Sequence, residues 1–351
     1  MQPTPAEYER ALRLLLAGEL VGLPTETVYG LGADATNPDA VAKIFAAKGR
    51  PADHPLIVHL ADVAALDDWA AEIPDFARQL AAHFWPGPLT LILKKQAWVP
   101  SAVTGGQDSV GLRVPAHPVA LALLQQFRTL KNAAPSGIAA PSANRFGRIS
   151  PTTAGHVRDE FSGLLHCILD GGPCQVGIES TIVDCTRGAP LILRPGQITA
   201  EAIAQVLAQE VCGAPRVSGE AGLAVNKESP HAPPRVSGSL AAHYAPLTPL
   251  RQLPPAEIPA FLAARQAAGE RCGVLTYSQP VLPGNFHAHI AMPADSAAYA
   301  HDFYAALRQL DALGLHAIIV ETLPAETAWK AVADRLQRAS AAHLPHPDST
   351  L

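Results

Sequence analysis

Apolar residues recur along the first 212 positions with two spacings, and segments of the two kinds alternate. Helical spacing predicts helices that begin near residues 5, 38, 74, 118, 151 and 200. Short apolar runs predict strands at 20–23, 56–60, 90–94, 110–114, 137–140, 166–170, 180–184 and 191–194. Because several strands follow one another without a helix between them, the pattern favours a twisted mixed sheet flanked by helices over a purely parallel sheet.

The pattern changes at residue 213 and again near residue 256. Residues 213–255 contain eight prolines and little periodicity, which indicates a linker or an ordered arm rather than a domain. Residues 256–351 return to helices and strands, with strands expected at 272–277, 287–292 and 316–321. We therefore predict an α/β protein with a catalytic domain over 1–212, a linker over 213–255, and a smaller Rossmann-like domain over 256–351. Without a GxGxxG motif or a P-loop, this second domain is not expected to bind a nucleotide itself.

Polar and basic residues gather around the helix predicted after Asn37. Residues 25–32 before it form a stretch rich in hydroxyls and glycine, which we read as an irregular loop, and Gly49 is placed to end the helix. Lys48 and Arg50 flank that helix end. A helix dipole alone favours cations there, and a lone His59 in a strand is commonly structural. The combination nevertheless indicates an anionic ligand.

Several ordered motifs resemble the YrdC/Sua5 family, the threonylcarbamoyl-AMP synthases. They are PTETVYGLG at 24–32, KGRP at 48–51, PLIVH at 55–59, FWPGPLT at 84–90, GLRVP at 111–115, SAN at 142–144, ESTIVD at 179–184 and LRPG at 193–196. The length of the chain makes it similar to the long Sua5 form. The resemblance implies synthesis of threonylcarbamoyl-AMP and pyrophosphate from L-threonine, bicarbonate and ATP, for the t6A modification at position 37 of tRNA. It also implies a downstream tRNA threonylcarbamoyl transferase machinery as partner.

Adenylation requires positive charge around phosphates, and planar guanidinium groups suit bidentate contacts with phosphate or carboxylate. Lys48 and Arg50 are the expected catalytic residues. The resemblance assigns to ATP the side chains of Lys48, Arg50, His54, Ser109, Ser142, Asn144, Ser150 and Arg194. It assigns to L-threonine the residues Thr27, His59, Arg113, Ala140 (through its backbone) and Ser180. His54 departs from the family, which usually has Asn there, and Ser150 alone could simply be a helix cap.

Residues 237–246 resemble the Sua5 interdomain segment, which ends in His-Tyr-Ala-Pro and folds back over the active site. His243 and Tyr244 are therefore lid candidates. Leu240, Ala241 and Ala242 replace the basic and aromatic residues usual in the family before this ending, so charged lid contacts are not expected from them. Mg²⁺ is expected to arrive with ATP, because the sequence has no dedicated carboxylate cluster.

The composition of the chain bears on two alternative functions, and both remain open. A net charge of −5 and 5% aromatic residues argue against an RNA-binding module, although a basic groove could still bind RNA weakly. A carbamoyl-phosphate-dependent carbamoyl transferase on the same fold is the other alternative. Five cysteines without CxxC spacing indicate a reducing compartment. With no long apolar segment and no signal peptide, a cytoplasmic location without membrane contact is expected.

Overall fold

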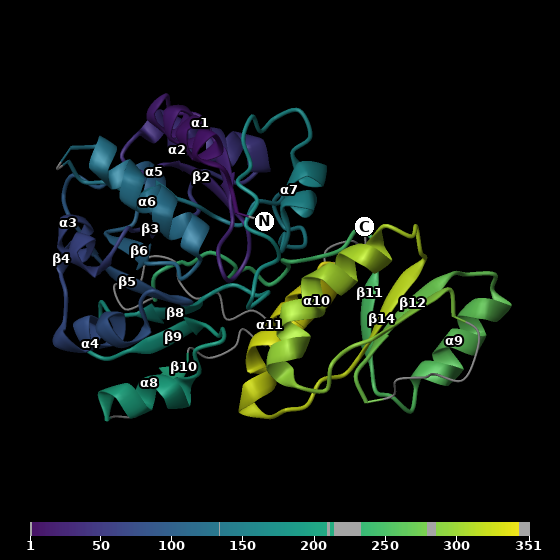
Figure 1. The fold of residues 1–351 in the computed structure, drawn as a ribbon. Helices are drawn as coiled ribbons and strands as arrows, with labels where there is room; N and C mark the ends of the chain where they lie inside the picture. The colour runs from purple at the N-terminus through teal and green to yellow at the C-terminus, as the bar shows by residue number, and fades with distance from the viewer. Residues whose placement is uncertain (1, 133, 209–210, 214–232, 279–285, 344–351) are drawn as a thin grey trace, which may run out of the picture.

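Two α/β units lie side by side in the computed structural model (Figure 1). The structure describes residues 2–132, 134–208, 211–213, 233–278 and 286–343. The predicted linker is therefore described only in part, since residues 214–232 lie outside these ranges. None of the helices in the described ranges has the length and apolar character needed to cross a lipid bilayer.

The larger unit is built on a ten-stranded mixed sheet with the order β1-β2-β7-β3-β6-β5-β8-β9-β10, and β4 pairs with β5 off this path. Its strands are β1 (Val21–Leu23), β2 (Gly30–Asp34), β3 (Ile57–His59), β4 (Ala70–Glu72), β5 (Leu89–Lys95), β6 (Ser109–Arg113), β7 (Ile138–Ala139), β8 (Thr181–Asp184), β9 (Leu191–Arg194) and β10 (Cys212–Gly213). The pairs β3–β6, β5–β8 and β9–β10 are parallel and the others antiparallel. The predicted mixed sheet is confirmed.

Helices cover both faces of this sheet. They are α1 (Pro5–Leu16), α2 (Pro38–Lys48), α3 (Leu66–Trp69), α4 (Asp75–Phe84), α5 (Ser101–Thr104), α6 (Pro118–Leu130), α7 (Ala154–Glu160) and α8 (Ala200–Leu207). In β7, Ile138 joins the apolar cluster formed with α1 and α6, whereas Ala139 joins the cluster formed with α2 and α4. Because neighbouring strand residues point to opposite faces, the two clusters lie on opposite sides of the sheet.

Helix α2 begins and ends as its sequence predicts. The Asn37 side chain accepts hydrogen bonds from the amides of Asp39 and Ala40. At the other end Gly49 adopts a left-handed conformation with φ of 65°, which a residue with a Cβ rarely adopts. The chain therefore turns sharply after Lys48, and Arg50 directly follows this turn.

The smaller unit has a parallel four-stranded sheet in the order β11-β14-β12-β13. Its elements are β11 (Leu250–Leu253), α9 (Ile258–Ala267), β12 (Cys272–Thr276), β13 (Ala288–Ala291), α10 (Ser296–Asp311), β14 (Ala317–Glu321) and α11 (Lys330–Ala341). One face packs on α9 and the other on α10 and α11. This parallel sheet with helices on both faces confirms the predicted Rossmann-like arrangement.

Helices α10 and α11 lie between the two sheets and join the units (Figure 1). Their apolar cluster includes Val28, Ile149 and Ile178 of the larger unit. Gly177, with φ of 80°, lies directly against α10: a Cβ there would lie 2.5 Å from the carbonyl oxygen of Ala300. The backbones of the two units therefore touch at this point.

The structure corrects four details of the prediction. Gly30 and Gly32 belong to strand β2, because Gly32 allows close packing: a Cβ there would lie 2.6 Å from Leu23. Residues 166–170 form only an isolated bridge, between Gly22 and Ile168, and no strand. The helix expected after Ser150 starts at Ala154 with Thr153 as its cap. Residues 250–253, placed in the linker, form the edge strand β11.

Candidate active site

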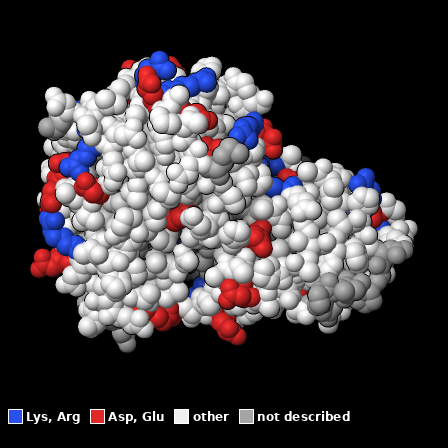
Figure 2. Space-filling view, in the orientation of Figure 1, with Lys and Arg blue, Asp and Glu red and all other residues white. Residues whose placement is uncertain are grey.

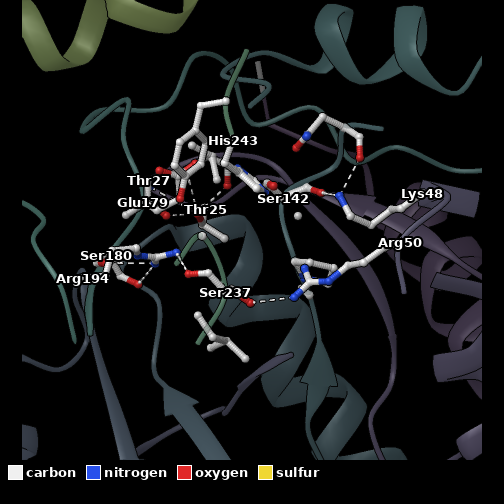
Figure 3. Close-up of a pocket in the computed structure, with 18 of the residues that line it drawn as sticks. Thr25, Thr27, Lys48, Arg50, Ser142, Glu179, Ser180, Arg194, Ser237 and His243 are labelled. Carbon is white, nitrogen blue, oxygen red and sulfur yellow. Dashed lines mark hydrogen bonds between the residues drawn. The ribbon is translucent and has the colours of Figure 1, made fainter. Parts of the chain in front are cut away.

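A cavity opens where the loop before β2, the end of α2, the loop after β7 and the segment around residues 237–244 meet. Its polar lining is drawn in Figure 3. The structure brings ten of the predicted site residues to this cavity, together with both lid candidates. They are Thr27, Lys48, Arg50, His59, Arg113, Ala140, Ser142, Asn144, Ser180, Arg194, His243 and Tyr244.

Lys48 is a buried cation held by the loop after β7. Its ammonium group donates hydrogen bonds to the carbonyl oxygens of Ser142 and Asn144, each at 2.5 Å. The loop is in turn fixed to the start of β2, where the amide of Ala143 donates to the carbonyl of Tyr29. Burial and the charge of Arg50 lower the pKa of Lys48 well below its ordinary value, and an anion bound beside it would stabilise the charged form.

Two buried guanidinium groups face the same space. Arg50 donates to the carbonyl of Pro55 at 2.8 Å and to the Ser237 hydroxyl at 3.1 Å. Arg194 donates to the carbonyl oxygens of Ser180 and Ser237. Burial lowers the pKa of Arg50 to about 10, so that this guanidinium remains charged at neutral pH, and burial also lowers the pKa of Arg194.

Each of these three cations donates only to neutral acceptors within the described part of the chain. Burying positive charge without a counter-ion costs free energy, which an anion bound in the cavity would recover. The cavity is therefore built to receive negative charge.

The neighbouring wall holds Arg113 and His59, which are paired neighbours on β6 and β3. Arg113 donates to Glu26 at 2.6 Å, to Thr27 at 2.9 Å and to the carbonyl of Gly87 at 3.1 Å. Each terminal nitrogen of a guanidinium carries two protons, so two donors of Arg113 remain beyond these bonds. They suit a small carboxylate.

One segment contributes Ser237, Gly238, His243 and Tyr244 to the cavity lining. Figure 3 shows Ser237 and His243 among the residues around the cavity. Tyr244 has a left-handed backbone with φ of 63°, unusual for a bulky residue. His243 packs edge-on against Phe146, with ring centroids 5.9 Å apart. These placements bring both lid candidates to the cavity wall.

Buried polar atoms without a hydrogen-bond partner concentrate in this cavity. Such atoms are rare in folded proteins, since each costs free energy. Of six among the described residues, five belong to the cavity lining: Arg50 Nε, His59 Nδ1, Asn144 Oδ1, His243 Nδ1 and the Tyr244 hydroxyl. This concentration indicates that the cavity binds a polar ligand.

Three predicted residues lie outside the cavity lining. His54 packs behind it against Phe146, with ring centroids 5.4 Å apart. Ser109 lines a smaller adjacent hollow with Val236. The Ser150 hydroxyl is fully buried and donates to Glu179 at 2.6 Å, so its partner is a carboxylate.

Among the polar side chains of the lining, Thr25, Glu179 and Ser237 were given no role from the sequence. Glu179 directly precedes Ser180 within the ESTIVD motif, Thr25 lies in the motif that contains Thr27, and Ser237 begins the segment of the lid candidates. The motif itself was the available signal for Glu179.

The buried histidines predict a dependence of stability on pH. Burial lowers the pKa values of His59 and His243 to about 3 each, below the unfolded value of 6.5. The unfolded chain therefore binds more protons between pH 3 and 6.5, and stability falls as pH drops below about 6.5. Each histidine contributes about 1.4 kcal/mol per pH unit inside this window.

Urea unfolding between pH 4.5 and 5.5 measures this slope. His243→Gln should reduce it by about 1.4 kcal/mol per pH unit. A slope equal to that of the wild type would show that this imidazole titrates alike in the folded and unfolded chains.

Comparison with known protein families assigns the chain to a family. Residues 13–196 match the Sua5–YciO–YrdC family, whose description is telomere recombination, and residues 198–341 match a domain described as the C-terminal domain of threonylcarbamoyl-AMP synthase. The chain belongs to the Sua5–YciO–YrdC family. The resemblance found in the sequence motifs is confirmed.

Several relatives match this chain over nearly their whole length and nearly the whole of this chain. Threonylcarbamoyl-AMP synthase of Bacillus subtilis is 40% identical over 95% of this chain and 93% of its own length. The protein of that name from Pyrococcus abyssi is also 40% identical, over 92% of this chain and 91% of its own. A crystal structure of P. abyssi Sua5 complexed with L-threonine covers 98% of this chain and 96% of its own, with a TM-score of 0.86 and 36% identity.

Proposed function

We propose that this protein is an L-threonylcarbamoyladenylate synthase, a nucleotidyltransferase that uses ATP, L-threonine and bicarbonate. The observation that carries this proposal is the cavity with three buried cations paired only to neutral acceptors. Relatives that match nearly the whole chain are named threonylcarbamoyl-AMP synthases. The carbamate oxygen of N-carboxythreonine would attack the α-phosphorus of ATP, and the bond to the leaving pyrophosphate would break.

The phosphates of ATP would be bound by the three buried cations, Lys48, Arg50 and Arg194. In phosphoryl and nucleotidyl transfer, negative charge spreads over non-bridging and leaving oxygens, and catalysis consists mainly of positioning and electrostatic stabilisation. The carbamate is already an anionic nucleophile, so no general base is required. Ser142 and Asn144 lie beside Lys48 and would orient phosphate or ribose oxygens.

A second group of residues is suited to bind L-threonine. It consists of Arg113, Thr27, His59, Ser180 and the backbone of Ala140. They form the neighbouring wall of the same cavity. The two remaining donors of Arg113 would hold the amino-acid carboxylate. A Sua5 structure complexed with L-threonine supports threonine as the amino-acid substrate.

Within this proposal Mg²⁺ would enter bound to the phosphates of ATP, because the described lining residues offer no free carboxylate to hold it. In the described ranges, no group of three or more His, Cys, Asp or Glu side chains could hold a metal ion. Glu179, which lines the cavity, has its carboxylate occupied by Ser150, Tyr304 and Arg335. When bound, the ion would neutralise charge on the phosphates of ATP.

The experiment is a reconstitution with the purified chain. Incubation with ATP, L-threonine and bicarbonate should release pyrophosphate and form a threonylcarbamoyl adenylate detectable by mass spectrometry. Omission of any one substrate should abolish both products. Pyrophosphate release that does not need threonine would contradict the proposal, and product formation from carbamoyl phosphate without ATP would favour the transferase alternative.

The product would then pass to a tRNA threonylcarbamoyl transferase machinery, for t6A at position 37. Binding of RNA by the chain itself gains little support from its surface. Figure 2 shows basic and acidic side chains interspersed over the visible face. RNA affinity that falls steeply with salt, in a protein without adenylation activity, would favour the RNA-binding alternative.

A further inference from the structure

A buried network links the C-terminal domain to the cavity wall. Arg335 of α11 is fully buried, and its Nε donates to the carboxylate of Glu179 at 3.1 Å. Tyr304 of α10 donates to the same carboxylate at 3.0 Å, and Ser150 donates to its other oxygen at 2.6 Å. Arg335 also lies over the ring of Tyr244, 5.5 Å from its centroid. Two helices of one domain thus fix a side chain of the other.

Glu179 is the acidic side chain among the described residues that line the cavity, and it immediately precedes Ser180. Burial alone would raise the pKa of Glu179, but Arg335, Arg194 and the Ser150 hydrogen bond together lower it below its ordinary value. The carboxylate is therefore ionised close to the cations that would bind phosphate. A free carboxylate there would repel the triphosphate and attract Arg194.

Because of this network, Arg194 has no ion pair with Glu179. Its guanidinium donates to the carbonyl oxygens of Ser180 and Ser237 and to the Ser180 hydroxyl, and it forms no ion pair with a described carboxylate. Glu179, although one residue from Ser180, is instead turned toward Arg335. The positive charge that pairs with Glu179 comes from Arg335 of the C-terminal domain. The charge of Arg194 therefore remains available to an anionic ligand.

We propose that Arg335 is a positioning residue: it holds Glu179 away from Arg194 and so makes the C-terminal domain an electrostatic part of the ATP site. This inference rests on the proposed function, in which Arg194 contacts the phosphates. Loss of Arg335 leaves a buried carboxylate without its ion-pair partner, and its charge then acts on Arg194, which is already coupled to it electrostatically. The ATP affinity then falls.

Calorimetric titration of the full chain with ATP, without threonine, tests this directly. Arg335→Met should raise the Kd for ATP by about tenfold or more, because one charge of a buried pair is left unpaired. Arg335→Lys keeps the charge and should stay within about threefold of the wild type. Arg265→Met, which removes a partly exposed ion pair with Glu270 in the same domain, is the matched control and should leave the Kd unchanged.

The decisive variant is Arg335→Met combined with Glu179→Gln. It removes both charges and should return the Kd to within about threefold of the wild type. A double variant that binds ATP as weakly as Arg335→Met would overturn the proposal, because the defect would then come from domain docking alone.

If Arg335→Met does not fold, Tyr304→Phe tests the same proposal with a smaller perturbation of Glu179. It removes one donor from Glu179 and should weaken ATP binding by about threefold, and this effect should vanish in the Glu179→Gln background. Persistence of the effect in that background would also overturn the proposal. Failure of the proposed function would look different: the wild type would bind ATP yet form no threonylcarbamoyl adenylate, and the comparison of Kd values would still stand.

Discussion

Arg50→Ala is expected to reduce pyrophosphate release about 10²–10³-fold, the effect of removing one preorganised donor from a developing charge. Arg50 is buried, its Nε has no partner within the described chain, and its other donors reach only Pro55 and Ser237. The substitution leaves no carboxylate unpaired, so the fold should remain intact. Steady-state pyrophosphate release at saturating threonine and bicarbonate measures the effect.

Lys43→Ala is the matched control for this experiment. Lys43 lies on α2, pairs with Glu19 at 2.7 Å and is partly exposed. Its removal should change activity by less than about twofold, since exposed ion pairs contribute little. Near-normal turnover of Arg50→Ala, in a protein with unchanged thermal stability, would remove Arg50 from the catalytic residues.

Arg113→Met is expected to have two separable effects. The pair of Arg113 and Glu26 is almost completely buried, and loss of one partner leaves an uncompensated carboxylate, at a cost of about 3–5 kcal/mol in the free energy of unfolding. The same substitution removes the donors proposed for the threonine carboxylate, so the KM for threonine should rise about tenfold or more. Urea unfolding and threonine titrations of pyrophosphate release measure the two effects.

Glu26→Gln in the Arg113→Met background separates stability from binding. The amide keeps an acceptor for the backbone of Ala116, which Glu26 holds at 3.0 Å, and removes the buried charge. We expect much of the stability to return while the KM for threonine stays high. If Arg113→Met instead weakened only ATP binding, the assignment of the two cavity walls would be reversed.

Local chemistry explains why much of the site could be predicted from the sequence. Asn37, Gly49 and the apolar spacing between them determine where α2 begins and ends, and therefore where Lys48 and Arg50 lie. Family motifs then indicated which distant segments meet these cations. The structure places Ser142 and Arg194 at the same cavity, although neither follows from periodicity.

Long-range contacts explain what was missed. Arg335 and Glu179 are 156 residues apart, and no local spacing indicates that a helix of the second domain pairs with a strand end of the first. Ser150 resembled a helix cap because Pro151 follows it, yet its hydroxyl donates to Glu179. Gly32 resembled a turn residue because its packing partners, Leu23 and Ile138, come from other strands.

The contact of Gly177 with α10 limits how the two domains can move. The loop and the helix meet backbone to backbone, without side chains between them that could adjust. Any movement that presses this loop further into the helix is blocked by the main chains themselves. A single added methyl group at position 177 would therefore have to push the two domains apart.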